Sequence, residues 1–293
     1  MPFPSFLLIG ANKAGTTSIY HYLGQHPEIY VSPIKEPSFF AIEGRSDLDD
    51  IQRAWKMTGS LDEYLALFDG VTTEKAWGEA STAYLSTPTA AANIHRRIPN
   101  VKLIAILRHP IERAYSQYAM NVRLGIETLP TFEAAVQAEL NHGPQLPCLP
   151  YLAMGYYFTQ LQRYTSCFDA RQILVLVNRD LSAAPLGVMR RIFRFLEVDE
   201  AFAPDLGQRH NVAPDRPLPA GPISPRLPGP LRRIARALLS QSLQARIRDG
   251  LRAMRPSRPA VAPTLRRQLV ALYRPEISNL QDLIGRDLSD WLR

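Results

Sequence analysis

Three short apolar runs, each followed by a segment with helical periodicity, dominate the hydrophobic pattern of the chain. The runs and the helical segments that follow them cover residues 3–9 and 16–23, 102–107 and 111–124, and 172–177 and 189–196. Short apolar runs that alternate with amphipathic helices are typical of a parallel sheet covered by helices on both faces. The pattern therefore predicts an α/β fold whose ligands bind beyond the carboxyl ends of the strands.

The last third of the chain changes character at a proline-rich segment. Residues 214–230 contain seven prolines, which exclude a helix or a central strand, so an irregular connector is expected there. Residues 231–258 then carry apolar side chains at helical spacing among many arginines, and residues 263–283 form a further helical pattern. We interpret residues 1–293 as one domain with a C-terminal helical extension.

The net charge of +7 is concentrated in the basic segment. Residues 226–258 hold nine arginines and one acid, a local charge of +8 that leaves −1 for the rest of the chain. Such a segment fits a lid that packs on the core, a peripheral contact with an anionic membrane, or a binding surface for an acidic polysaccharide. Binding to nucleic acid is not expected, because no recognised module or aromatic platform accompanies the charge.

Features near the start of the chain and its cysteine content bear on location. No apolar run is long enough to span a membrane. The chain has no basic leader and passes directly into its first apolar run, which we interpret as a strand and not as a signal peptide. A cytoplasmic location is therefore expected, and Cys148 and Cys167 should stay reduced there.

A glycine-rich loop after the first apolar run carries the strongest chemical signal. Residues 10–18 read Gly-Ala-Asn-Lys-Ala-Gly-Thr-Thr-Ser and open the first helix. Small residues let backbone N–H groups approach a phosphate, the helix start adds a positive dipole end, and a lysine adds a full charge. The residues expected to bind an anion are Lys13, Ala14, Gly15, Thr16, Thr17 and Ser18.

The position of the lysine separates this loop from the usual nucleoside-triphosphate loop. In the pattern G-x-x-x-x-G-K-[ST] the lysine follows the second glycine, whereas here Thr16 follows Gly15 and the lysine is Lys13, inside the loop. The residue after the 102–107 run is Arg108, a cation where a kinase would carry a metal ligand. We therefore predict that no metal ion takes part.

A second anion-binding motif follows the 102–107 run. Arg108 comes directly after this run, and Ser116 lies two turns into the helix that follows. An arginine fork and a hydroxyl at the end of a strand can close on a phosphate. Two separate anion sites suit a nucleotide that is phosphorylated at both of its ends.

These motifs resemble those of the sulfotransferases that use PAPS (3′-phosphoadenosine 5′-phosphosulfate), in particular the carbohydrate type related to the heparan sulfate sulfotransferases and bacterial homologues. Residues 10–18 match the family's 5′-phosphosulfate loop, and residues 108–116 match its 3′-phosphate motif. Further similar stretches cover residues 35–40, 77–85, 155–168 and 273–291. The resemblance implies a P-loop-like sheet and PAPS as a co-substrate that leaves as adenosine 3′,5′-bisphosphate.

The resemblance also implies roles for individual residues. Glu36 matches the glutamate that takes the proton from the acceptor, and Lys35 beside it would orient the acceptor or neutralise the sulfuryl oxygens. Lys13 would stabilise the phosphate oxygen that leaves. The family's late Lys-Gly-x-Arg loop over the nucleotide is not intact, and Arg209 or Arg216 is expected to replace it.

Rival assignments remain open at this point. His21, His26 and His210 compete with Glu36 as the base, because other branches of the superfamily use histidine. The rival functions are a P-loop-type nucleoside or small-molecule kinase, and a module of the same fold that only binds an anionic sugar. The absence of the kinase lysine and of a magnesium carboxylate favours sulfuryl transfer over the kinase.

The acceptor is not determined by the sequence. Ala80 and Ala41 stand where the heparan-type enzymes carry a lysine and an acid that handle the acceptor. A small molecule, a glycolipid and a saccharide therefore all stay open as acceptors, with a hydroxyl or an amine as the reacting group. The oligomeric state is also left open.

Overall fold

The computed structural model describes residues 3–45, 57–143, 150–207 and 261–293. Several sequence predictions lie outside these described residues: those for Cys148, Arg209, His210 and Arg216, for the connector 214–230, and for the basic segment 226–258.

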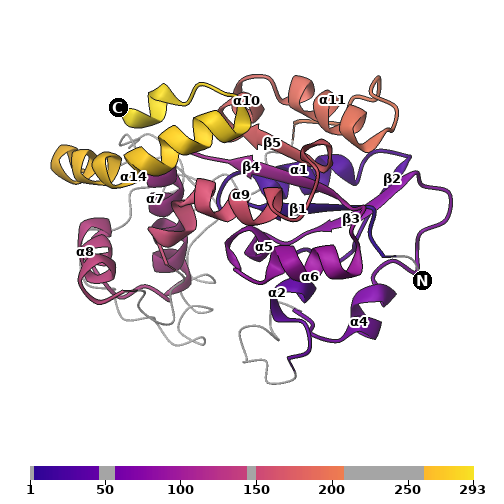
Figure 1. Cartoon of the computed structure of the whole chain (residues 1–293), viewed down its shortest axis with the longest axis horizontal. Coiled ribbons are helices and arrows are strands. Elements are labelled where there is room, and N and C mark those ends of the chain that lie inside the picture. Colours follow the sequence, from indigo (N-terminus) through magenta and orange to yellow (C-terminus); the bar gives the residue numbers. More distant parts are fainter. Residues whose placement is uncertain (1–2, 46–56, 144–149, 208–260) are drawn as a thin grey trace, which may run out of the picture.

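Five parallel strands form the central sheet (Figure 1). They are β1 (Phe6–Gly10), β2 (Ile29–Val31), β3 (Ala76–Ala80), β4 (Lys102–Leu107) and β5 (Ile173–Val177). Their order across the sheet is β2-β3-β1-β4-β5. Side chains of β1 and β4 are almost wholly buried, as expected for strands covered on both faces. The predicted α/β fold with a central parallel sheet is confirmed.

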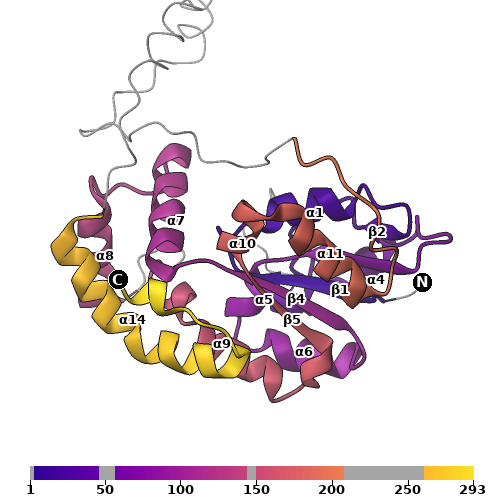
Figure 2. The same ribbon diagram turned by 90° about the horizontal axis from the view of Figure 1, so that it is seen from above.

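Helices cover both faces of this sheet (Figure 2). One face carries α1 (Thr16–Leu23), α10 (Asn178–Ala183) and α11 (Pro185–Leu196), and the other carries α6 (Ala90–Arg97) and α9 (Tyr157–Thr165). The short helices α2 (Phe39–Ile42), α4 (Leu61–Ala66) and α5 (Ala83–Ser86) lie in the connections that flank β3. None of the helices within the described ranges is long and apolar enough to cross a membrane.

A helical group stands beside the sheet, at the left of both views (Figures 1 and 2). It consists of α7 (Pro110–Leu124), α8 (Phe132–His142) and α14 (Pro263–Ile284). The long helix α14 packs on α7 and α9, and short 3-10 turns at Ala153–Gly155, Ala170–Gln172 and Ser289–Leu292 complete the described chain. The C-terminal helix predicted for residues 263–283 is present.

The strand order explains how the two anion motifs meet. The chain crosses from β1 to β2 and β3 on one side of the sheet, and then returns to place β4 and β5 on the other side. β1 and β4 are therefore direct neighbours, paired from Phe6↔Lys102 to Gly10↔Ala105. In a parallel sheet the carboxyl ends of neighbouring strands lie at one edge, so the loops after β1 and β4 leave the sheet side by side.

Candidate active site

The loop after β1 depends on glycine at both of its ends. Gly10 has φ 150° and Gly15 has φ 108°, a region of the backbone map that favours glycine. A Cβ atom on Gly10 would lie 2.9 Å from the Cβ of Leu85, and one on Gly15 would lie 3.1 Å from the Nδ2 atom of Asn178. The loop thus needs both the conformational freedom and the small size of glycine before α1 begins at Thr16.

Asn178, directly after the edge strand β5, holds the loop in place. It follows β5 directly, and its Nδ2 donates a hydrogen bond of 2.7 Å to the carbonyl oxygen of Ala14. This residue was not among those predicted from the sequence. Its position at the carboxyl end of the 172–177 run was the signal that could have found it, because side chains there point toward the ligand edge of the sheet.

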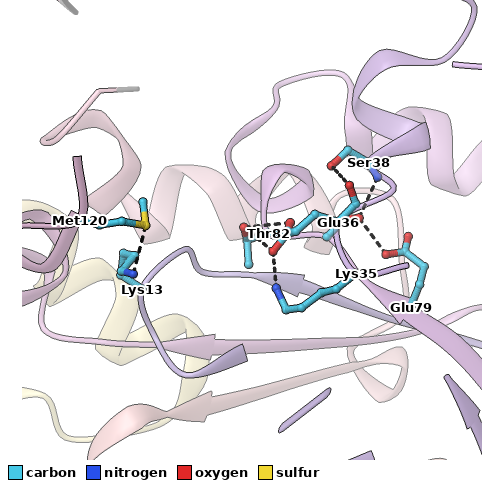
Figure 3. A network of polar contacts seen from close by, with 8 residues as sticks. Lys13, Lys35, Glu36, Ser38, Glu79, Thr82 and Met120 are labelled. Carbon is cyan, nitrogen blue, oxygen red and sulfur yellow. Dashed lines mark hydrogen bonds and ion pairs between the residues drawn. The ribbon is translucent and has the colours of Figure 1, made fainter. Parts of the chain in front are cut away.

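Lys13 lies among other cations at this edge of the sheet. Its Nζ atom lies 3.4 Å from the sulfur of Met120 on α7 (Figure 3). The pKa of Lys13 is lowered from 10.5 to about 8, mainly by burial and then by the positive charges of Arg123, Arg108, Lys35 and Arg113, in that order. Keeping these positive charges close together costs free energy because they repel one another. The site therefore favours a ligand with more than one negative charge.

Arg108 joins the second motif to the first. It follows β4, and its Nη1 donates a hydrogen bond of 3.2 Å to the carbonyl oxygen of Lys13. Its Nη2 lies 3.5 Å from the carboxylate of Glu112 on α7. Ser116 lies half-buried further along α7. The structure therefore brings together the loop and the strand-end arginine, which come from two segments far apart in the chain.

Glu36 lies in a turn between β2 and α2 and is held by two segments (Figure 3). Its Oε1 lies 2.5 Å from the Nζ of Lys35, and its Oε2 accepts a hydrogen bond of 2.6 Å from the backbone N–H of Thr82. The Thr82 hydroxyl lies 3.1 Å from the same oxygen. About a quarter of the Glu36 side chain is exposed, 26% by surface area, so the carboxylate is fixed but still accessible.

Thr82 and Glu79 are functional candidates that the sequence analysis missed. Both belong to the 77–85 stretch that carried the family likeness, yet neither was given a role. Glu79 is buried in β3 with 1% of its surface exposed, and burial is the main cause that raises its pKa to about 7. A carboxylate inside a strand was the signal, but β3 itself was not predicted, so its burial could not be foreseen.

The two rival histidines that the structure describes have different surroundings. His21 is exposed on α1. His26 is buried, its Nδ1 accepts a hydrogen bond from the N–H of Glu28, and its Nε2 lies 2.9 Å from the carbonyl oxygen of Asp199. His26 therefore has backbone partners at both nitrogens and serves packing between α1 and the end of α11.

Potential metal ligands do not gather in the part of the chain that the structure describes. No group of three or more histidine, cysteine, aspartate or glutamate side chains that could hold an ion occurs there. The carboxylates of Glu36 and Glu112 pair instead with Lys35 and Arg108. The prediction that transfer needs no metal ion stays a prediction.

Comparison with known proteins assigns the family. Residues 3–206 match the family model described as a sulfotransferase domain, which covers more than half of the chain. The chain belongs to the sulfotransferase family. A crystal structure of a sulfotransferase from Alicyclobacillus acidocaldarius is 30% identical, covers 100% of both chains and superposes with a TM-score of 0.75.

Two curated relatives match about two thirds of the chain. The chain is 30% identical over 214 residues to bifunctional heparan sulfate N-deacetylase/N-sulfotransferase 1 of Xenopus laevis, and 30% identical over 204 residues to the protein of that name from Homo sapiens. These matches cover 68% and 67% of this chain, but only 23% and 22% of the relatives. The chain thus spans about a quarter of the length of these relatives.

Proposed function

We propose that this protein transfers a sulfuryl group from PAPS to an acceptor hydroxyl or amine. The observation that carries the proposal is the hydrogen bond from Arg108 to the carbonyl oxygen of Lys13, which unites two anion-binding motifs around a lysine. The lowered pKa of Lys13 supports it, because the clustered cations that contribute to it would be neutralised by a doubly phosphorylated nucleotide.

The residues at the sheet edge fit the two ends of this donor. The loop residues 13–18 would hold the 5′-phosphosulfate, and Arg108 with Ser116 would hold the 3′-phosphate. When bound, PAPS supplies a sulfuryl group that is already attached to a phosphate leaving group. A sulfuryl group carries less negative charge than a phosphoryl group, so a lysine and backbone donors suffice without a divalent ion.

Transfer then requires one proton acceptor and one oxyanion stabiliser. Glu36 takes the proton of the acceptor while the acceptor oxygen or nitrogen forms its bond to sulfur. The bond between sulfur and the phosphate oxygen breaks, and its electron pair stays on that oxygen. Lys13 stabilises the negative charge that develops there, and Lys35, 2.5 Å from Glu36, orients the acceptor or neutralises the sulfuryl oxygens.

We propose a saccharide, a glycolipid or a glycosylated small molecule as the acceptor. The support is the identity to relatives named as heparan sulfate N-deacetylase/N-sulfotransferases. Ala80 and Ala41 replace the charged residues that the heparan-type enzymes carry, which favours an acceptor with fewer charges than heparan sulfate. Whether the reacting group of the acceptor is a hydroxyl or an amine is decided by where the product carries its sulfate, on oxygen or on nitrogen.

The experiment that tests the transfer combines the purified protein with PAPS and fractionated cell extract. Mass spectrometry should detect molecules that gain the mass of one SO3 group, together with an equal amount of adenosine 3′,5′-bisphosphate. The Glu36→Gln variant is the matched control, because it keeps the size of the side chain and removes the proton acceptor. Absence of any sulfated product with all acceptor classes would contradict the proposal.

Calorimetry distinguishes this proposal from the kinase. The protein should bind adenosine 3′,5′-bisphosphate in buffer that contains EDTA, and binding should weaken when Arg108 is replaced by methionine. A kinase would instead bind Mg-ATP tightly and show little affinity for the bisphosphate. A protein that binds the bisphosphate but forms no product would indicate the binding-only module.

A further inference from the structure

Glu79 is a buried carboxylate that has three hydroxyl partners. Its Oε1 accepts hydrogen bonds from Tyr84 at 2.6 Å and from Tyr64 at 3.3 Å, and its Oε2 accepts one from Ser81 at 2.8 Å. Among the described residues no lysine or arginine forms an ion pair with it. A buried anion without a counter-ion is costly, so its retention in β3 calls for a specific reason.

The Ser81 hydroxyl connects Glu79 by hydrogen bonds to the turn that carries Glu36. Because this hydroxyl donates its proton to Glu79, its oxygen is free to accept, and it accepts the N–H of Ser38 at 2.9 Å. An ionised Glu79 has no proton to donate, so it fixes the direction of the whole relay. Figure 3 shows Glu79 and Ser38 next to Glu36.

The residues on either side of Ser81 hold the same turn. The carbonyl oxygen of Ala80 accepts the N–H of Glu36 at 2.9 Å, and Thr82 binds the Glu36 carboxylate. Glu36 and Ser38 both have positive φ angles, 66° and 56°, which are uncommon for residues other than glycine. Such a backbone persists only where its surroundings hold it, and the end of β3 provides that hold.

The charge of Glu79 is sensitive to pH in the neutral range. Its pKa is raised to about 7: burial is the main cause, the negative charge of Glu36 adds to the rise, and the hydrogen bonds from Tyr84, Ser81 and Tyr64 partly offset it. These groups face Glu79 from the residue directly after β3, from α4, from α5 and from the turn after β2. A protonated Glu79 would need an acceptor for its own proton, and it would accept the hydrogen bond of the Ser81 hydroxyl less strongly and no longer in one fixed direction.

We propose that Glu79 is a positioning residue for sulfuryl transfer: as a carboxylate it orients Ser81, and through Ser81 and Ser38 it holds the turn that directs Glu36 at the acceptor. This inference rests on the proposed function, since it takes Glu36 as the proton acceptor. It predicts that transfer slows as the pH falls through the range in which Glu79 gains a proton.

The Glu79→Gln variant tests this role, because it keeps the shape of the side chain and removes its charge. Turnover should fall about ten- to a hundredfold, as expected when a base is displaced from its productive geometry. The affinity for adenosine 3′,5′-bisphosphate and the KM for PAPS should stay unchanged. The loss of turnover that the wild type shows as the pH falls through about 7 should be absent from the variant.

Two hydroxyl variants form a matched pair. Ser81→Ala and Tyr64→Phe each remove one hydroxyl donor from Glu79, but only Ser81 also contacts Ser38. At a pH at which Glu79 is ionised in each protein, Ser81→Ala should reproduce the loss of turnover, and Tyr64→Phe should keep wild-type turnover. Equal losses in both variants would show that Glu79 acts only on the stability of the core, and would overturn the proposal.

A double-mutant cycle separates this inference from the proposed function. If Glu79 acts through Glu36, the Glu79→Gln change should cause no further loss of turnover in a Glu36→Gln background. A full additional loss there would overturn the positioning role while leaving sulfuryl transfer intact. Wild-type turnover of Glu36→Gln alone would instead refute Glu36 as the base, a failure of the proposed function itself.

Discussion

Lys13 differs from the arginines around it because it can lose its proton near neutral pH. Arginine stays charged throughout the biological range, whereas a buried lysine responds to its surroundings. Only five of the 34 basic residues in the chain are lysines, and two of them, Lys13 and Lys35, lie at the site. A lysine in the loop therefore couples the binding of an anion to the uptake of a proton.

Nucleotide binding should depend on pH through this lysine. The pKa of Lys13 is about 8 in the free protein, and bound phosphates should raise it toward 10.5 or above. Binding then favours the protonated form, so the affinity for adenosine 3′,5′-bisphosphate should be about tenfold weaker at pH 9 than at pH 7. Calorimetry in buffers of different ionisation enthalpy should show proton uptake. The Lys13→Arg variant should lack this pH dependence. Equal affinities of the wild-type protein at pH 7 and pH 9 would contradict the coupling between binding and protonation of Lys13.

Turnover should depend on the charge of Lys13. Removal of one donor from an oxyanion site typically lowers kcat by about 10²- to 10³-fold, so Lys13→Ala should lose activity on that order in a PAPS-dependent assay. Lys75→Ala is the control, because Lys75 is 60% exposed and pairs with Glu28 away from the loop. Unchanged turnover in Lys13→Ala would remove this residue from the mechanism.

The two ends of the glycine loop are held by two different helices. Gly15 lies against Asn178 of α10, and Gly10 lies against Leu85 of α5, so the loop is confined from two sides. The space that surrounds each glycine therefore comes from segments far away in the sequence. The spacing of the glycines was readable from the chain, but the reason why each must be glycine was not.

Gly15→Ala should impair both stability and binding. Its φ of 108° is unfavourable for alanine, and the added Cβ would crowd Asn178 and Leu181. We expect a loss of about 1–2 kcal/mol in the free energy of unfolding by urea, with a clear loss of bisphosphate affinity. Gly285→Ala is the control, since Gly285 has φ 59° at the end of α14 with open space around it. It should lose similar stability but keep its affinity.

Two of the five strands, β2 and β3, could not be predicted from the sequence pattern. β1 and β4 are apolar apart from Lys102 at the start of β4, and both were predicted, although β1 begins at Phe6 and not at residue 3. β2 has three residues, too few for a periodic signal, and β3 contains Gly78 and Glu79. Both were missed, because the burial of β3 comes from its neighbours in the sheet and not from an apolar run of its own.

The C-terminal helix α14 packs against α7 and α9. Leu269, Tyr273 and Ile277 of α14 are buried against α7 and α9, and the Tyr273 hydroxyl donates a hydrogen bond of 2.8 Å to the carbonyl oxygen of Leu152. The helix α7 also carries Ser116 and Met120. Packing of α14 therefore supports the helix that forms one wall of the site.

This packing predicts a large effect on stability at one face of α14. Leu269 is fully buried, so Leu269→Ala should lower the free energy of unfolding by about 2–5 kcal/mol. Leu283 on the same helix is 36% exposed, and Leu283→Ala should change it by less than about 1 kcal/mol. Urea denaturation of both variants measures the difference, and similar losses would contradict the observed orientation of α14.

Local pattern was enough to recognise the α/β class, the loop around Lys13 and the arginine after β4, because residues close in the chain determine strand, turn and helix. It did not place Thr82 on the carboxylate of Glu36, Asn178 on the loop, or Glu79 behind the turn. Thr82 lies 46 positions from Glu36 in the chain, and Asn178 lies 164 positions from Ala14 in the loop. They exist because the order of the strands brings separate segments to one edge of the sheet, and no periodicity along the chain encodes that order.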